Sequence, residues 1–519
     1  MATGKSTVGA LVAQTTGRPF IDLDRNIESE AGASIESLFA TRGEAAFRAL
    51  ERGCLERVLN EATRALHPPV IAVGGGALIA RDLRLRALDE CVVVALEGSP
   101  AELTRRALGQ GPRPLLSGPN PEQRVSELLA LRSTSYAEAH ARISCEAPLE
   151  SVAAEVAQVW ARDELAVAVG EASYSVQTGL GFASGRVGAL LAQSPVCVLV
   201  SDTTVSALHG APIEAALRAA GARLIRVDLT PGEAHKNIAS IEPIWQAALS
   251  GGADRKATFV GLGGGVVTDM TGFAASTWMR GVRWLSIPTT LLGMVDASVG
   301  GKTGVDLGAA KNAVGAFWQP SAVLCDVHHL STEPARGFIS GLAEVVKTAL
   351  IGDPELFTLL EDNAERVAAR DADLTAELVR RSVRVKARIV SCDQRENGLR
   401  AVLNLGHTVG HALEAQAGYS ALSHGEAVSL GLVAALRLGE ALGKTPHDLS
   451  ERTLSLLRRL GLPATLAGQP LAEATALLGH DKKRAGSSVK FVFARALGQV
   501  ETQSLGLNEL RTRVLQLAE

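Results

Sequence analysis

The stretch Thr258-Phe-Val-Gly-Leu-Gly-Gly-Gly265-Val-Val-Thr-Asp269 passes from an apolar run through a glycine-rich turn into a helical pattern. Glycines at such a turn let the backbone approach a pyrophosphate at the N-terminus of the following helix. The spacing is not G-x-G-x-x-G, so a dinucleotide site and a simple tight turn both fit it. The stretch does predict a strand followed by a helix, which is the repeating unit of an α/β fold with a parallel sheet.

Apolar segments on both sides of this stretch extend the same alternation. They are Leu165–Val169, Val196–Val200, Arg223–Val227 and Trp284–Ile287. After about residue 335 the strand pattern fades, and residues 336–480 are predicted to be helical almost throughout. A late strand is expected at Val489–Phe493, with a possible partner near residues 500–505. We therefore predict a Rossmann-like α/β domain over 165–330, followed by an all-helical domain over 331–519.

The N-terminal part repeats the α/β alternation independently. Short apolar strands are expected at Pro19–Asp24, Val70–Val73 and Cys91–Leu96, with amphipathic helices between them. This pattern predicts a second parallel sheet and a domain over 1–160. A helix ending near Trp160 leads into a linker region at 161–172.

Composition narrows the classes of function for this chain of 519 residues. A net charge of -3 and an aromatic content of 4% give no basis for binding nucleic acid. The N-terminus lacks a signal-peptide pattern, and the most apolar window, 257–299, is interrupted by Asp269, Arg280 and Arg283. The six cysteines form no C-x-x-C pair, which favours reduced thiols. We expect a cytoplasmic protein that acts on small molecules and contacts neither nucleic acid nor membrane.

Three histidines crowd into the helical region. Two lie in Asn404-Leu-Gly-His407-Thr-Val-Gly-His411, and His424 follows in Ser423-His424-Gly-Glu426. A carboxylate, Glu344, lies upstream in Gly341-Leu-Ala-Glu344-Val-Val-Lys347. Two imidazoles and one carboxylate with an open position predict a catalytic divalent metal. Helical spacing alone would pair His407 with His411, one turn apart on one face.

The N-terminal segment Thr3-Gly4-Lys5-Ser6-Thr7 matches the end of a phosphate-binding loop. Backbone N–H groups at the helix start can hold phosphate oxygens, Lys5 can neutralise them, and Ser6 can reach Mg²⁺. The first glycine of the motif and the strand before it are not in the sequence, which puts kinase activity in question. We hypothesise that the natural start of translation lies upstream of Met1.

Further motifs make the first part resemble shikimate kinase, a small P-loop kinase. They are Gly4–Thr7, Phe20-Ile-Asp22-Leu-Asp24, Gly43-Glu-Ala-Ala-Phe-Arg48, Gly74–Gly76, Arg113-Pro-Leu-Leu116 and Arg132 before Tyr136. The resemblance implies ATP with magnesium, bound through Gly4, Lys5, Ser6, Thr7 and Arg113, with Ser6 on the metal and Asp22 supporting it. It implies that Asp24, Arg48, Gly75 and Arg132 hold shikimate. Asp24, which can accept the hydroxyl proton, and Lys5 are the catalytic residues it implies.

The second part resembles 3-dehydroquinate synthase over residues 165 to about 510. The matching segments are Gly264–Asp269, Pro288-Thr-Thr290, Gly300–Gly304, Gly341–Lys347, Arg395–Arg400, Asn404–His411 and His424–Glu426. The resemblance implies NAD and zinc (or cobalt) as cofactors. It assigns the metal to Glu344, His407 and His424, with His411 beside it as a proton-transfer residue. It also implies a homodimer formed through this part.

The resemblance carries over further residues. Those expected to contact NAD are Asp202, Glu233, Lys236, Gly264, Gly265, Val266, Asp269, Thr289, Thr290, Asp296, Lys302 and Lys311. Those expected to contact substrate are Arg280, Asp296, Lys347, Lys386, Arg400, Asn404 and Lys482, with Lys483 as an alternative to Lys482. Lys302, Glu396 and Asn312 join His411 as the expected catalytic residues.

The implied function is a fusion of two enzymes of one pathway. The synthase part would convert 3-deoxy-arabino-heptulosonate 7-phosphate to 3-dehydroquinate with release of phosphate, through transient oxidation by NAD⁺. The kinase part would phosphorylate shikimate with ATP. Two alternatives stay open. The second part could be a related sugar-phosphate cyclase or a polyol dehydrogenase, and the first part could be a non-catalytic docking domain.

Overall fold

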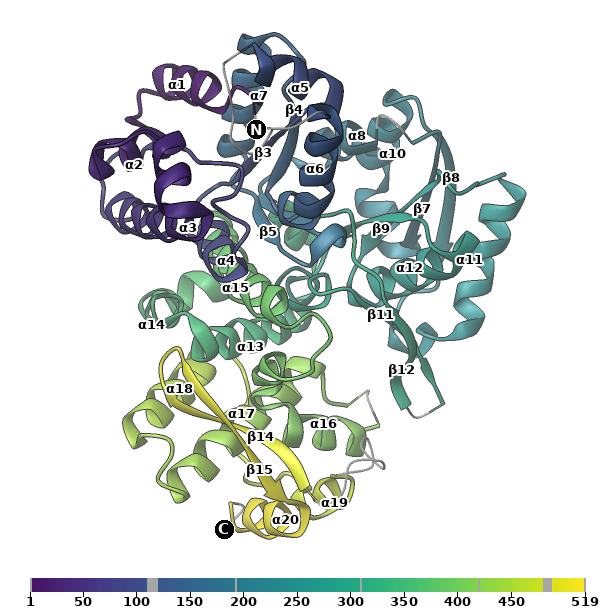
Figure 1. The fold of residues 1–519 in the computed structure, drawn as a ribbon. Coiled ribbons are helices and arrows are strands. Elements are labelled where there is room, and N and C mark those ends of the chain that lie inside the picture. The colour runs from purple at the N-terminus through teal and green to yellow at the C-terminus, as the bar shows by residue number, and fades with distance from the viewer. Residues whose placement is uncertain are drawn as a thin grey trace. The chain divides into compact units, whose positions relative to one another are not determined.

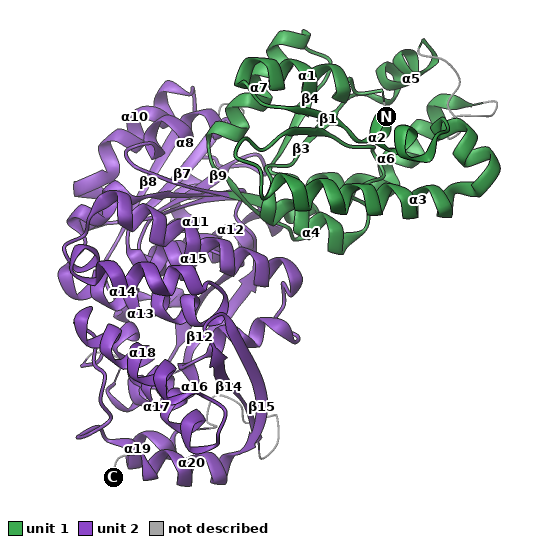
Figure 2. Ribbon diagram, turned by 90° about the vertical axis from the view of Figure 1, so that its left-hand side faces the viewer, with its two compact units in different colours: residues 1–175 green, residues 176–519 purple. Residues whose placement is uncertain are grey.

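The computed structural model describes residues 2–109, 120–191, 194–308, 310–418, 421–478 and 488–517 (Figure 1). The chain divides into two compact units, Met1–Ser175 and Val176–Glu519 (Figure 2). None of the described helices is both long and apolar enough to span a membrane.

The first unit alternates helices with short strands. Its helices are α1 (Lys5–Thr16), α2 (Leu23–Ala31), α3 (Ile35–Ala62), α4 (Arg81–Glu90), α5 (Pro100–Leu108), α6 (Pro121–Ala137) and α7 (Leu149–Ala161). Its strands are β1 (Phe20–Asp22), β2 (Val70–Ala72), β3 (Val94–Glu97) and β4 (Ala141–Ser144). The three predicted strands are confirmed, and β4 is additional.

The strands of this unit form two sheets, whereas the alternation predicts one. β1 pairs with β2 and β3 pairs with β4, both in parallel, and no ladder between described strands joins the two pairs. Val8 and Val12 of α1 pack in one apolar cluster with Val70 of β2 and Val94 of β3. Side-chain packing under α1 therefore connects the two strand pairs, which no hydrogen-bonded ladder between described strands joins.

The second unit is built on a sheet in which β13, β10, β9, β7 and β8 pair in parallel, as predicted. The sheet order is β5-β6-β13-β10-β9-β7-β8. The bounds are β5 (Leu165–Val167), β6 (Tyr174–Gly179), β7 (Val196–Asp202), β8 (Arg223–Leu229), β9 (Thr258–Gly263), β10 (Arg283–Pro288) and β13 (Ala322–Asp326). All residues of β7 and β9 are buried, which is typical of parallel strands covered on both faces.

Helices cover the two faces of this sheet, and β7 shows how its residues divide between them. Val198 and Val200 belong to a core cluster with α11 (Ile238–Ser250) and α12 (Gly265–Thr277). Cys197 and Leu199 belong to another with α8 (Ala183–Leu191) and α10 (Ala211–Ala219). The period of two along a strand therefore produces a three-layer arrangement.

The carboxyl ends of four neighbouring strands lie level with one another. Gly263 of β9 pairs with Pro288 of β10, Ser201 of β7 pairs with Leu262, and Asp202 pairs with Leu229 of β8. Residues that follow these strands consequently meet at one edge of the sheet, where such folds bind ligands.

A hairpin that the sequence pattern does not predict lies between β10 and β13 along the chain. β11 (Lys302–Leu307) and β12 (Ala310–Phe317) pair in antiparallel fashion. Lys302 and Lys311, both expected at the site, are thus held on the two arms of one hairpin.

The remainder is mostly helical, and a second hairpin precedes the last helix. The helices are α13 (Ala335–Gly352), α14 (Pro354–Ala368), α15 (Ala372–Cys392), α16 (His407–Gln416), α17 (His424–Ala441), α18 (His447–Arg459), α19 (Leu471–Ala476) and α20 (Leu507–Gln516). β14 (Ser488–Ala496) pairs with β15 (Gln499–Gly506), and β14 lies against α17 (Figure 1). The late strand and its partner are confirmed, so the region is not purely helical.

Candidate active site

Two glycines bring α13, α16 and α17 unusually close together. A Cβ atom at Gly425 would lie 1.9 Å from the carbonyl oxygen of Ser340 in α13. A Cβ atom at Gly431 would lie 1.8 Å from the carbonyl oxygen of Gly406, which caps α16. Only residues without a side chain permit these backbone contacts. The first turns of α16 and α17 are thereby held against the middle of α13.

This packing collects Glu344, His407 and His424 from three different helices. The Nε2 atoms of His407 and His424 each lie 3.4 Å from Oε1 of Glu344. The Glu344 side chain is 1% exposed, and neither of its buried oxygens has a hydrogen bond of good geometry. Three converging ligand atoms of the right types, one of them on a buried carboxylate, fit a divalent metal such as zinc.

The second nitrogen of each imidazole faces an acceptor. Nδ1 of His407 lies 3.2 Å from the carbonyl oxygen of Leu405, and Nδ1 of His424 lies 3.4 Å from Oε2 of Glu414. With a metal at Glu344, donation from Nδ1 to these acceptors would leave the Nε2 lone pair of each ring for the metal. The acceptors at Nδ1 therefore suit the tautomer that a metal at this point requires.

The charges around the group shift its pKa values strongly. Burial, together with the charge of Lys347, lowers the pKa of His407 to about 3. Burial alone would raise the pKa of Glu344, but Lys347 and the two imidazoles hold it near 2. Burial would lower the pKa of His424, but Glu344 and Glu414 raise it to about 10. Glu344 is therefore a carboxylate and His407 a neutral ligand at neutral pH.

A second grouping of ligand atoms shares His424. It combines His411, Glu414 and His424, and His411 is exposed. The ring centroids of His407 and His411 lie 5.0 Å apart, so the two histidines paired by helical spacing are neighbours. The group that contains Glu344 is the more deeply buried of the two.

Cationic side chains line the surroundings of the metal group. Lys347 forms an ion pair with Glu344, and Nζ of Lys386 lies 2.5 Å from Oδ1 of Asp296. Burial lowers the pKa of Lys386, and Asp296 opposes that effect. Arg400 donates to the carbonyl oxygens of Gly300 (3.2 Å) and Gln394 (2.6 Å). Buried cations in this density suit an anionic ligand.

A separate triad stands beside them. Lys302 pairs with Glu396, whose Oε1 accepts a hydrogen bond of 2.9 Å from Nδ2 of Asn404. Glu396 has a φ of 60°, in the left-handed region that non-glycine residues avoid. Backbone strain of this kind is common where a side chain must be aimed at a ligand.

The expected dinucleotide residues gather at the aligned strand ends. Asp202 ends β7, Glu233 follows β8, Gly264 follows β9 and Thr289 follows β10. Gly264 caps α12, which Gly265 and Val266 open, and a Cβ at Gly264 would stand 3.1 Å from Cγ2 of Thr290. This arrangement matches the crevice at the carboxyl edge of a parallel sheet.

Some of these residues already have partners. Asp202 accepts hydrogen bonds from the backbone of Thr204 and Val205, so it caps the short α9 (Thr203–Val205). Nζ of Lys236 donates to Oδ2 of Asp269 and to Oδ1 of Asn312, each at 2.6 Å. These contacts fix the positions of the expected cofactor residues before any ligand is bound.

One described residue that was expected at the site, Arg280, is not joined to these groups. Arg280 is exposed, with a φ of 67°, and within the described parts of the second unit no ion pair links it to the cluster. Arg113 and Lys482 lie outside the described residues, as does Lys483.

The first unit assembles its own expected site. α1 begins at Lys5 after Gly4, whose φ of 78° is left-handed, so the loop residues Gly4 to Thr7 stand at a helix N-terminus. Nζ of Lys5 lies 2.7 Å from Oδ2 of Asp24. Asp22 accepts from the backbone of Asp24 and Arg25 and thereby caps α2. The phosphate-loop lysine and the expected base thus already contact each other.

Two residues not singled out for this site complete it. Glu51 is buried and pairs with Arg48 at 2.6 Å, and burial raises the pKa of Glu51. The hydroxyl of Tyr136 donates to the carbonyl oxygen of Gly75 at 2.8 Å. Arg132 is buried, and its Nε has no hydrogen-bond partner among the residues that the structure describes. The carboxylate of Glu51 orients the expected substrate-binding arginine.

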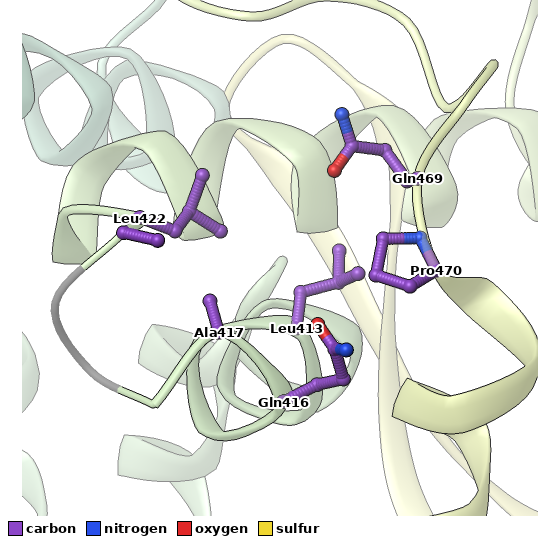
Figure 3. A pocket seen from close by; sticks show the side chains of 7 residues that line it. Leu413, Gln416, Ala417, Leu422, Gln469 and Pro470 are labelled. Atoms are coloured by element: carbon purple, nitrogen blue, oxygen red, sulfur yellow. The ribbon is translucent and has the colours of Figure 1, made fainter.

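A small pocket lies on the other side of α16. Its volume is about 160 Å³, and Figure 3 shows Leu413, Gln416 and Pro470 among its lining residues. None of the residues that line it is charged. The pocket is therefore distinct from the histidine cluster and carries none of its chemistry.

Glu414 is the residue of the main site that sequence reasoning missed. It is buried, accepts from Nζ of Lys311 at 2.8 Å, and faces His424. His407, His411 and Glu414 occupy positions i, i+4 and i+7 of one helix face. That spacing was the available signal.

Comparison with known proteins places these sites in two families. Family models match residues 1–161 ("Shikimate kinase"), 226–340 ("3-dehydroquinate synthase N-terminal") and 341–484 ("3-dehydroquinate synthase C-terminal"). A 3-dehydroquinate synthase from Geobacter metallireducens is 42% identical over 65% of this chain and 94% of its own length. One from Bordetella pertussis is 41% identical over 67% of this chain and 98% of its own.

A solved structure supports the same relationship. The 2-epi-5-epi-valiolone synthase from Streptomyces hygroscopicus, solved with NAD⁺ and Zn²⁺ bound, has a TM-score of 0.62 and 29% identity. The similarity covers 68% of this chain and 98% of that one.

Proposed function

Since this chain belongs to the 3-dehydroquinate synthase family and its N-terminal part matches shikimate kinase, we propose that it carries both activities. The synthase part converts 3-deoxy-arabino-heptulosonate 7-phosphate to 3-dehydroquinate and releases phosphate. The kinase part phosphorylates shikimate with ATP and magnesium. We place the kinase in residues 1–160, a linker region in 161–172, the NAD-binding part in 165–330 and the metal- and substrate-binding part in 331–519.

The observation that carries the synthase proposal is the convergence of His407 Nε2 and His424 Nε2 on a buried Glu344 without good hydrogen bonds. These residues would hold zinc or cobalt. A metal bound there would supply Lewis-acid activation of substrate hydroxyls, and NAD⁺ would supply reversible hydride transfer. The residues that would hold NAD⁺ stand at the carboxyl ends of β7 to β10, where the sheet offers a dinucleotide crevice.

The chain's own side chains orient the substrate. The buried ammonium groups of Lys347 and Lys386 and the guanidinium of Arg400 suit its phosphate and carboxylate groups. Lys302, Glu396 and Asn404 form one hydrogen-bonded set that can hold hydroxyl groups in place. His411, exposed and adjacent to the metal ligands, is placed to move a proton.

The same observations weigh against the alternatives. A polyol dehydrogenase has no use for three buried cations because its substrate is uncharged. A related cyclase remains the nearest alternative, since the valiolone synthase shares the fold at 29% identity. The higher identity to 3-dehydroquinate synthases, 42% and 41%, supports the heptulosonate phosphate as substrate.

Product identification tests the synthase proposal. The full-length chain, supplied with NAD⁺, Zn²⁺ and the heptulosonate phosphate, should form 3-dehydroquinate, which mass spectrometry detects. The matched variant Glu344→Gln keeps the size of the side chain but not its charge, and it should form none. Release of phosphate from another sugar phosphate, with none from the heptulosonate phosphate, would favour the cyclase alternative.

The kinase proposal rests on the first unit alone. Gly4 to Thr7 open α1, and the cluster of Asp24, Arg48, Glu51 and Arg132 joins a base to two arginines that can bind a carboxylate. ATP-dependent phosphorylation of shikimate by the full-length chain tests it. If the chain does not phosphorylate shikimate, the docking-domain alternative is favoured, whether or not ATP and shikimate bind.

Two further properties belong to this proposal. The family relationship supports a homodimer formed through the synthase part and residence in the cytoplasm. Sedimentation equilibrium tests the dimer, and cell fractionation tests the location.

A further inference from the structure

Glu414 lies where the metal group and the cofactor edge of the second unit meet. Its side chain is 4% exposed, and its two oxygens face different partners. Oε2 lies 3.4 Å from Nδ1 of His424, and Oε1 accepts a hydrogen bond of 2.8 Å from Nζ of Lys311. A buried carboxylate is costly unless both oxygens are satisfied, and here the two partners satisfy them.

The contact with His424 determines how that ring presents itself. Of the two ring nitrogens, Nδ1 faces Glu414 and Nε2 faces Glu344. Both nitrogens therefore face a carboxylate at the same distance. A metal held by Glu344 would take the Nε2 lone pair, so the ring hydrogen would then be on Nδ1, where Glu414 accepts it.

The contact with Lys311 reaches the other half of the site. Lys311 stands on β12, and its Nζ also lies 3.3 Å from Oε1 of Glu233, which follows β8 at the sheet edge. The chain His424–Glu414–Lys311–Glu233 therefore connects α17, α16, the hairpin and the dinucleotide crevice. Removal of the Glu414 charge would take one carboxylate partner away from Lys311.

Glu414 could instead be a metal ligand, because it forms a second possible group with His411 and His424. That role would require the Nδ1 lone pair of His424, whereas a metal at Glu344 would take Nε2 and leave the ring hydrogen on Nδ1. It would also remove Oε1 from Lys311. The contacts of Glu414 fit an orienting residue better than a ligand.

We infer that Glu414 is a positioning residue that fixes the His424 tautomer for metal binding and anchors Lys311 at the cofactor edge. This inference rests on the proposed function of Glu344, His407 and His424 as the metal site. It predicts two separable contributions. The hydrogen bond to His424 serves metal affinity, and the negative charge serves NAD⁺ affinity through Lys311.

The test uses the full-length chain and measures binding without turnover. Zinc affinity is measured by competition with a chromophoric chelator, and NAD⁺ affinity by titration of the zinc-loaded protein. The variants are Glu414→Ala and Glu414→Gln. Gln416→Ala is the matched control, because Gln416 is exposed on the same helix and lines the pocket of Figure 3.

Glu414→Ala should weaken zinc binding by about 10- to 100-fold, as expected for loss of a partner that orients a ligand. Glu414→Gln should weaken it much less, because the amide oxygen still accepts from Nδ1. Both variants should weaken NAD⁺ binding to a similar degree, since both lose the charge. Gln416→Ala should match the unaltered chain in both measurements.

Wild-type zinc affinity in Glu414→Ala would overturn the inference, as would equal loss of zinc affinity in the Ala and Gln variants. If Glu414→Ala does not fold, Glu414→Gln decides: retained zinc affinity with weakened NAD⁺ binding supports the inference, and unchanged NAD⁺ binding overturns it. Failure of the unaltered chain to bind zinc would instead contradict the proposed function itself.

Discussion

Gly425 packs so closely against Ser340 that a Cβ atom on the glycine would lie 1.9 Å from the serine carbonyl oxygen. The backbone N–H of Gly425 also donates to Oγ of Ser340 at 2.9 Å. Gly425 follows His424 directly, and Ser340 lies one helical turn before Glu344. This single backbone contact therefore sets the distance between two expected metal ligands.

Gly425→Ala should separate α17 from α13 and impair the metal site. A methyl group 1.9 Å from backbone cannot be accommodated by a side-chain rotation. We expect the free energy of unfolding to fall by about 3 kcal/mol and zinc binding to weaken. Urea unfolding and zinc competition measure the two effects. Gly185→Ala in α8, where a Cβ meets nothing within 4 Å, is the control and should not destabilise the chain.

Bound zinc should be lost in His424→Ala and retained in His411→Ala. Loss of His424 removes one of three converging ligands, so zinc content and synthase activity should fall together. Loss of His411 should leave zinc in place and lower kcat by about 100-fold or more, as expected for a proton-transfer group. Metal analysis of the purified variants measures this. Loss of zinc in His411→Ala with zinc retained in His424→Ala would reverse the assignment.

The sequence predicts the local features of this site, but it does not predict which helices come together to form it. The strand, the glycine turn and the start of α12 at Gly265 are short-range features, and the structure contains them. Helical spacing also correctly makes His407 and His411 neighbours. The approach of His424 depends on Gly431 packing against Gly406, a contact between two helices that no periodicity encodes.

The β11–β12 hairpin and the first unit also contain features that the sequence does not predict. Residues 302–317 contain several glycines and no regular alternation, so strand pairing there is specified by tertiary packing more than by propensity. In the first unit, alternation predicts parallel strands but not whether they join in one ladder, and β2 and β3 do not pair.

Glu333 should make stability depend on pH near neutrality. Burial raises the pKa of Glu333 to about 7, although the backbone N–H of Leu291 and the charge of Arg370 oppose the rise. A raised carboxyl pKa gives stability that is fully present below the unfolded value, near 4.5, and lost as pH rises through 7. Glu333→Gln should abolish this pH dependence. At pH 8 the free energy of unfolding of the variant should exceed that of the unaltered chain by about 3 kcal/mol.

Chemical denaturation of the full-length chain at pH 5 and pH 8 measures this difference in the free energy of unfolding of the second unit. Glu473→Gln, an exposed position on α19, is the control and should leave the pH dependence unchanged. A Glu333→Gln variant that loses stability between pH 5 and pH 8 as the unaltered chain does would contradict the assignment.

Lys5→Ala should abolish phosphorylation of shikimate and leave synthase activity intact. Lys5 lies in the first unit at the start of α1, and its half-buried pair with Asp24 contributes at most about 1 kcal/mol to stability. Parallel assays of both activities on one preparation measure the effect. Arg57→Ala, which removes an exposed pair with Glu30, serves as the control. Loss of synthase activity in Lys5→Ala would show that the two activities are not independent.

The most direct test of the proposed synthase follows phosphate and NADH together in the full-length chain. Metal-stripped protein is given NAD⁺ and 3-deoxy-arabino-heptulosonate 7-phosphate, and zinc is then added. A synthase returns each hydride it removes, so we predict many phosphates released per chain after zinc addition, with no accumulation of NADH. Accumulation of NADH without release of phosphate would contradict the account and identify a dehydrogenase.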